Sequence, residues 1–219
     1  MSTAAQADLS LFGERLAAFN LLPSLTLHPL READYGQAPQ PDWPAALHAA
    51  WHRHRSALIL KRLGLAERPA ADPGRPELAL ALLPPEALWR CLRCIGAALC
   101  APRLRRAIAG PEVRQFLQAL GPQVMAFARG PAAQLAVAVP ACAGYGAEQA
   151  VAAVHELGRA VLNEALAGGG PEIALRAELK LPPGPAAAPP CRGEAARALA
   201  LDVLKHCDPT WHSSFPATP

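Results

Sequence analysis

The sequence predicts a mainly α-helical protein, a compact bundle of short helices joined by proline-rich loops. Leucine and alanine dominate a composition that is 52% hydrophobic but only 5% aromatic, and both residues are compatible with helices at little conformational cost. The β-branched and aromatic residues that strands favour are sparse. The 24 prolines and 16 glycines mark where helices begin and end, because proline lacks a backbone donor and fixes its own dihedral angle. A chain of 219 residues can bury a core built from aliphatic helix faces.

Residues 1–72 are predicted to form an N-terminal helical region with a proline-rich arm. Apolar residues recur at helical spacing from Leu9 to Phe19 and indicate a first helix that ends before Pro23. The stretch 21–44 is interrupted by prolines. It therefore favours an extended arm or an ordered loop with little regular structure.

A second helix is expected to begin near Asp42 and Pro44, since an aspartate side chain can cap free amides and proline is tolerated in the first turn. Its apolar face is predicted to carry Leu47, Trp51, His54, Leu58 and Leu65. Gly64 and the run 68–76, which is rich in proline, are then expected to end the helix and form a linker.

Residues 73–219 are predicted to form a central and C-terminal helical body that packs with the first region as one globular unit. After Pro84 and Pro85, an apolar stripe at helical spacing marks the densest helical block. The stripe consists of Leu88, Leu92, Ile95 and Leu99. Pro102 and the Gly-Pro pairs at 110–111 and 121–122 divide the adjoining segment into short helices, which only mutual packing can make stable.

The C-terminal third contains two further predicted helices. Residues 147–166 form the clearest amphipathic helix, which the run 168–171 closes. Residues 173–181 alternate apolar with polar or small side chains, and so short a run fits a strand as well as a helix. A proline-rich connector at 182–190 precedes a last helix from about residue 193 to residue 207.

The charge and the N-terminus bear on location and partners. A formal net charge of +3 is too weak to indicate nucleic acid binding without a local patch. The N-terminus lacks the basic start and apolar core of a secretory signal. The most apolar stretch, 131–147, is broken by Pro140 and is shorter than the roughly 20 apolar residues that span a bilayer. We therefore expect a cytoplasmic protein with no direct membrane insertion.

Two cysteines form the most specific chemical candidate. Cys91 and Cys94 have the CxxC spacing, which can chelate a metal or carry out thiol exchange because sulfurs one helical turn apart can converge on one atom. A second pair is missing, and His206, Cys207 and His212 match no standard zinc spacing. Because both cysteines fall on or beside the apolar stripe, we predict buried reduced thiols and no metal site.

Other motifs of enzymes are incomplete. His155 begins a zincin-like pattern, but Arg159 stands where the second histidine is needed. A possible strand at 135–139 precedes the glycines at 144–146 as in a dinucleotide fold, yet Gln149 occupies the place of the third glycine. No GxSxG sequence occurs. We therefore predict that the chain is not an enzyme and binds no cofactor.

Basic clusters and a terminal aromatic pair are the candidate partner-binding features. A solvated helix face explains the clusters at 52–55 and 103–106 as well as an acidic partner does, and the second cluster is the better candidate. The two aromatic residues near the C-terminus could pack on the body or insert into a partner's groove. The predicted partner-binding residues are Arg103, Arg105, Arg106, Trp211 and Phe215.

Several helical segments together carry a family resemblance. They are residues 92–100, 104–110, 117–121 and 126–128 in the centre, 19–23 and 27–29 near the N-terminus, and 179–182 and 209–212 near the C-terminus. With these segments the chain resembles the SctK family of type III secretion sorting-platform proteins. The resemblance covers nearly the whole chain and consists of helix-packing patterns, so it transfers no active-site residues.

The resemblance implies a cytoplasmic adaptor that stays peripheral to the inner membrane through the secretion apparatus. The expected partners are the SctQ-type pod protein and the cytoplasmic domain of the SctD-type inner-membrane ring protein, and indirectly the export ATPase complex. Two alternatives remain open. One is a metal- or thiol-dependent regulatory protein that uses Cys91 and Cys94, and the other is a basic nucleic-acid binder, which predicts salt-sensitive retention.

Overall fold

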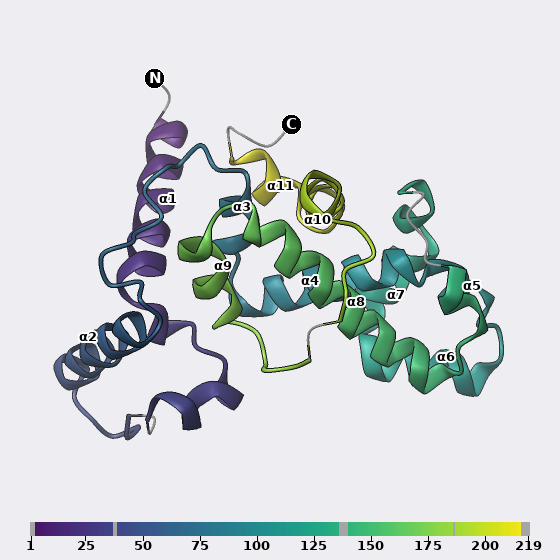
Figure 1. Ribbon diagram of the computed structural model, residues 1–219, viewed down its shortest axis with the longest axis horizontal. Helices are drawn as coiled ribbons and strands as arrows, with labels where there is room; N and C mark the ends of the chain where they lie inside the picture. The colour runs from purple at the N-terminus through teal and green to yellow at the C-terminus, as the bar shows by residue number, and fades with distance from the viewer. Residues whose placement is uncertain (1–2, 37–38, 136–139, 186, 216–219) are drawn as a thin grey trace.

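The computed structural model describes residues 3–36, 39–135, 140–185 and 187–215, and every regular element within them is a helix. The prediction of a mainly α-helical bundle of short helices is therefore confirmed. Helices α1 and α2 lie at one end of the molecule, α5 and α6 at the other, and α4 and α8 between them (Figure 1). Within the described residues, no helix combines the length and apolar character that crossing a bilayer requires.

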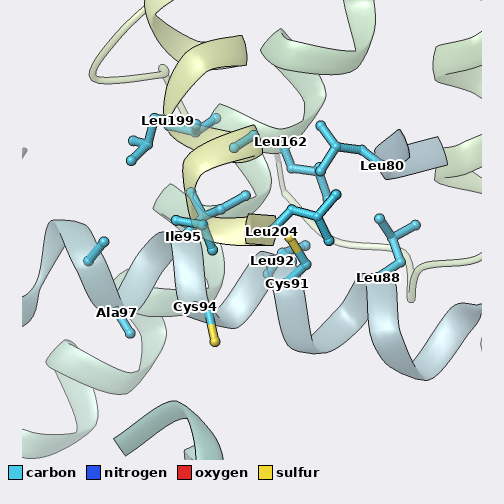
Figure 2. Packing of buried hydrophobic residues seen from close by; sticks show 14 of the residues in the cluster. Leu80, Leu88, Cys91, Leu92, Cys94, Ile95, Ala97, Leu162, Leu199 and Leu204 are labelled. Carbon is cyan, nitrogen blue, oxygen red and sulfur yellow. The ribbon is translucent and has the colours of Figure 1, made fainter. Parts of the chain in front are cut away.

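The core forms where α4 (Pro85–Leu99) packs along α8 (Ala147–Ala167) and α10 (Gly193–Cys207) covers both. The predicted stripe of α4 is fully buried at Leu88, Leu92 and Ile95 and almost fully buried at Leu99. Figure 2 shows side chains from α8 and α10 meeting this stripe, among them Leu162 and Leu204. The prediction of an aliphatic core is confirmed.

Three short helices follow α4 and begin at the predicted breaks. They are α5 (Ala101–Arg106), α6 (Gly110–Leu120) and α7 (Pro122–Arg129), and each has a proline in its first turn. Proline suits that position because the first amides of a helix have no intrahelical acceptor. Helix α7 packs against α4 and α5, and α6 packs against α8, through fully buried Phe116 and Leu120 among others. Their stability therefore depends on mutual packing.

The N-terminal region starts with α1 (Thr3–Leu21), which ends before Pro23 as predicted. The arm that follows is more regular than we expected, because it contains the 3-10 helices η1 (Pro23–Leu25) and η2 (Pro29–Tyr35). Helix α2 (Ala45–Arg62) then begins after Pro44, and no side chain caps its N-terminus, so the capping role predicted for Asp42 is wrong.

The predicted apolar face is also wrong within α2, although its last residue, Leu65, is buried just beyond the end of the helix. Leu47 and Leu58 are 46% and 53% exposed, whereas Ser56 and Ile59 are fully buried on a different face. The physical reason is polar packing: the Ser56 hydroxyl donates to Ser24 Oγ at 2.8 Å and accepts from the Ser24 amide at 3.2 Å. A face that is buried through hydrogen bonds does not stand out as an apolar stripe.

Helices α3 (Glu77–Ala81) and α9 (Pro171–Glu178) complete the body, and they pack against each other. The run that fitted a strand or a helix is therefore helical as far as Glu178. Helix α3 is fully buried and was not predicted, because five residues show no period. Of the possible strand at 135–139, residues 136–139 lie outside the described residues. They fall between the 3-10 helices η3 (Pro131–Gln134) and η4 (Pro140–Gly144).

Candidate functional site

The turn between α5 and α6 exposes one large apolar side chain among arginines. Ile108 is 92% exposed, the largest value among the large hydrophobic residues whose side chains the structure describes. It lines an open pocket of about 520 Å³ together with Arg105, Arg114 and Arg129. We call these four residues the arginine-rimmed face. It presents an apolar centre surrounded by positive charge.

Local backbone geometry holds Ile108 in this position. Helix α5 ends at Arg106, and the backbone of the next residue, Ala107, is extended. Gly110 with a following proline then starts α6 three residues after Ala107. Ala107 itself is buried, and its carbonyl accepts a hydrogen bond from Arg129 Nη2 at 3.2 Å. The turn is therefore fixed on both sides of Ile108. Sequence reasoning overlooked Ile108, Arg114 and Arg129, although a single isoleucine in an Ala-Gly turn was the available signal.

The structure divides the predicted arginine cluster into two kinds of residue. Arg103 points inward: its Nε donates to the Tyr145 carbonyl at 2.5 Å, and its Nη2 pairs with Glu112. The guanidinium also lies 5.4 Å from the centre of the Phe116 ring. Arg105 and Arg106 are exposed. Arg103 thus joins α5 to α6, while the other two arginines are available to a partner.

The cluster at 52–55 is divided in the same way. Arg55 is buried, and its guanidinium donates to the backbone carbonyls of Glu32, Tyr35 and Gly36. Burial lowers its pKa from the usual value. Arg53 and His54 remain exposed on α2. Arg55 therefore holds the arm against α2, and the cluster is not one continuous basic patch.

The C-terminal aromatic pair packs on the body through α11 (Pro209–Ser213). The Trp211 indole Nε1 donates to the Ala79 carbonyl at 2.7 Å, and the Arg15 guanidinium lies 4.4 Å from the ring centre. Phe215 is buried, with its ring 5.5 Å from Phe12 in an edge-to-face arrangement. An open pocket of about 250 Å³ remains beside these rings. The pair therefore connects α1, α3 and α11.

The predicted cysteines are both buried, and their sulfurs point in different directions. Figure 2 shows the sulfur of Cys91 directed toward the core beside Leu204, and the sulfur of Cys94 directed away from it. Among the residues that the structure describes, no three His, Cys, Asp or Glu side chains are grouped as metal ligands would be. Burial raises the pKa of Cys91 well above its usual value. The thiol adjacent to Cys94 is instead Cys207, from α10.

The remaining polar motif residues have structural contacts. His155 is half-buried against the Trp89 ring at 5.3 Å between ring centres. Burial lowers its pKa, and the charges of Arg93 and Arg159 act in the same direction. Arg159, where a zincin would have its second histidine, donates to the Pro182 carbonyl at 2.8 Å. These residues support packing between α4, α8 and the 182–190 connector.

Comparison with known proteins gives one family. A family model described as "YOP proteins translocation protein K (YscK)" matches residues 37–214, which is most of the chain and includes the arginine-rimmed face. No curated protein matches the sequence. No solved structure matches it either.

Proposed function

The chain belongs to the YscK family and is therefore a type III secretion component, and from this premise we propose that it is a non-enzymatic adaptor of the sorting platform. In this role it connects the SctQ-type pod protein to the cytoplasmic domain of the SctD-type inner-membrane ring protein. Through the pods it would contribute to recruitment of the export ATPase complex. It would be cytoplasmic and peripheral to the inner membrane.

The arginine-rimmed face is the observation that carries this proposal. A single exposed apolar side chain is common on protein surfaces, but Ile108 is held in a fixed turn and lines a pocket whose other large side chains include three arginines. Arginines around it favour an acidic partner surface, because complementary charge speeds encounter and fixes register. A central apolar anchor within a polar rim is the usual arrangement of a protein interface. We assign to this face an acidic partner surface that provides an apolar pocket for Ile108.

An adaptor needs two separate surfaces, and the molecule offers them. The arginine-rimmed face lies at the α5–α6 end, while α11 lies over the middle of the molecule, near α3 and α10 (Figure 1). The pocket beside Trp211 is lined by Arg15 and Asp208 in addition to aromatic rings, so it suits a small side chain with a polar end. We propose this C-terminal surface, with Trp211 and Phe215, as the second contact.

Co-purification of the full-length chain with the pod and ring proteins tests the proposal. The double variant Arg105→Glu, Arg106→Glu changes one arginine of the face and its exposed neighbour in the sequence, and the single variant Ile108→Asp changes the apolar centre of the face. Both alter only exposed side chains. We expect each to lose recovery of one partner by roughly tenfold or more and to keep the other, since removing a hot spot costs at least about 2 kcal/mol.

The control is the double variant Arg53→Glu, Arg192→Glu, which makes the same change in charge at exposed positions away from this face. It should recover both partners like the wild type. If the Arg105, Arg106 and Ile108 variants also recover both partners fully, the face is not a docking surface, and the family membership is unaffected.

A further inference from the structure

Two cysteines from distant parts of the chain line one open pocket at the end of α10. Cys94 comes from α4 and Cys207 from the last turn of α10, and they share the pocket wall with Arg90 and His206. The pocket has a volume of about 450 Å³. Cys207 is half-buried, whereas Cys94 is only 2% exposed. A small solute can therefore reach Cys207, with a second thiol directly beside it.

The surroundings of the two thiols give them different roles. A hydrogen bond from the Cys94 thiol lowers the pKa of Cys207, and the positive charge of Arg90 also lowers it. Burial and the negative charge of Asp208 act in the opposite direction, but the pKa of Cys207 is lowered overall. The same hydrogen bond, together with burial, raises the pKa of Cys94. Because the thiolate is the nucleophile, Cys207 is the thiol prepared to react and Cys94 is its protonated neighbour.

The other four cysteines lack this combination. Cys91 is buried in the core. Cys100 and Cys142 also lie beside each other, but both are buried, and burial raises the pKa of Cys100. Cys191 is half-buried, and burial raises its pKa. The Cys94–Cys207 pair therefore joins access from a pocket, a neighbouring thiol and a nearby positive charge.

We propose that this pocket is an oxidation site at which hydrogen peroxide converts Cys94 and Cys207 into a disulfide. In the first step the Cys207 thiolate attacks one peroxide oxygen, so an S–O bond forms and the O–O bond breaks. The hydroxide that leaves takes up the proton that Cys207 released and becomes water. Cys207 is then a sulfenic acid. In the second step the Cys94 sulfur attacks the Cys207 sulfur. The S–S bond forms, the S–O bond breaks, and water leaves with the Cys94 proton. Two thiols are oxidised and one peroxide is reduced, with water as the only by-product.

The disulfide joins two elements that the chain separates widely. It connects α4 with the end of α10, one residue before Asp208, whose carboxylate caps α11 by accepting from the Trp211 amide at 3.0 Å. A cross-link between positions so far apart in sequence restricts the unfolded chain strongly. Oxidation therefore stabilises the folded chain and fixes the base of the α11 segment to the body. This inference does not depend on which protein partners the chain binds.

Mass spectrometry of the native full-length protein tests the proposal. The reduced protein is treated with hydrogen peroxide, the remaining thiols are blocked with iodoacetamide, and the peptides are mapped. We expect a Cys94–Cys207 linked peptide as the first oxidation product, and a higher Tm that returns to its original value on reduction. In Cys94→Ser, dimedone should capture Cys207 as a sulfenic acid. In Cys207→Ser, neither the linked peptide nor the adduct should form, and Cys191→Ser, at a half-buried position outside the pocket lining, should behave like the wild type.

A second measurement needs no variant. A short pulse of iodoacetamide on the native reduced protein should label Cys207 roughly tenfold faster than Cys191, since the larger thiolate fraction decides the rate. Equal or faster labelling of Cys191 overturns the proposal. So does a Cys100–Cys142 disulfide that forms before the Cys94–Cys207 disulfide.

Discussion

Gly96 of α4 and Gly158 of α8 lie against each other where the two central helices cross. A Cβ atom on Gly96 would stand 1.8 Å from the carbonyl oxygen of Val154, and a Cβ atom on Gly158 would stand 2.2 Å from that of Leu92. Both obstacles are backbone atoms, which cannot rotate away. The absence of two side chains therefore sets the distance between the helices that form the core.

Replacing Gly96 with alanine should strongly destabilise the protein. The added methyl group must push α8 away from α4, and overpacking of this kind costs roughly 1–3 kcal/mol or more. Chemical denaturation of the variant should show the loss in free energy of unfolding. Gly13 is the matched control, because it is exposed in α1 and a Cβ added to it would meet no atom within 4 Å. Gly13→Ala should be neutral or stabilising by a few tenths of a kcal/mol up to about 1 kcal/mol.

Lys180 should make stability depend on pH. Burial lowers its pKa from 10.5 to about 7, and Arg15 acts in the same direction, while Nζ donates to the carbonyls of Ala81 and Leu83 at 2.6 and 3.0 Å. Below pH 7 both the folded and the unfolded chain hold the proton, so the full cost of burying the charge is present. As the pH rises above 7 the folded chain releases the proton first, and stability increases by on the order of 1 kcal/mol per pH unit.

Urea denaturation of the wild type and of Lys180→Met between pH 7 and about pH 8.5 measures this effect. This pH range lies above the usual pKa of histidine and below the usual pKa of cysteine. Above the cysteine pKa the thiols of the unfolded chain ionise before the buried thiols of the folded chain, which lowers stability. The difference in unfolding free energy between the two proteins should grow with pH in favour of the wild type. Parallel pH profiles would show that Lys180 keeps its ordinary pKa in the folded protein.

The ease of predicting an element depended on the kind of contact that buries it. The stripe of α4 is apolar and periodic, and prolines and glycines mark the helix ends, so the sequence was sufficient there. The buried face of α2 depends on Ser56 and Arg55, whose burial is made possible by hydrogen bonds to distant groups. No local sequence pattern predicts these hydrogen-bond partners.

The candidate sites depend on tertiary contacts in the same way. The spacing of Cys91 and Cys94 suggested a pair, but the helix directs their sulfurs apart. Cys94 instead shares a pocket with Cys207, which comes from a distant part of the sequence. Ile108 is a candidate contact residue only because the folded turn exposes it beside arginines from α6 and α7. The residues of each site are far apart in the sequence, so local sequence motifs do not predict either arrangement.

The buried carboxylate of Glu77 should depend on Arg197. Glu77 is 1% exposed, its Oε1 accepts from Arg197 Nη1 at 3.0 Å, and its Oε2 has no hydrogen-bond partner among the described residues. Arg197→Met would leave the Glu77 carboxylate without its cation and should lower the free energy of unfolding by about 2 kcal/mol. This is less than the cost of breaking a fully buried ion pair, because Arg197 is partly exposed to solvent.

Denaturation of three variants separates charge from packing at this pair. Adding Glu77→Gln to Arg197→Met should recover part of the loss, because the neutral amide is less costly to bury. The exposed Arg192→Met should change stability by no more than about 0.5 kcal/mol. An Arg197→Met variant as stable as Arg192→Met would show that Glu77 does not need its partner.

We propose that residues 1–72 and 73–219 form one unit that survives cleavage between them. The Asn20 side chain makes two hydrogen bonds to the backbone of Ala70, at 2.8 and 3.1 Å, and the Lys180 ammonium lies 5.0 Å from the centre of the Phe19 ring. Arg31 Nε donates to the Leu181 carbonyl at 2.8 Å. The contacts of Phe19 and Arg31 cross the proposed boundary and do not require an intact linker.

A protease site inserted between Asp72 and Pro73, in the exposed part of the linker, provides the test. After cleavage the two fragments should elute together from a sizing column under native conditions and separate only in denaturant. The additional variant Arg31→Ala removes the hydrogen bond to Leu181 and the ion pair with Glu178, and should let the cleaved fragments separate at lower denaturant. Fragments that separate without denaturant would instead show two independent domains, because the linker would then be what holds them together.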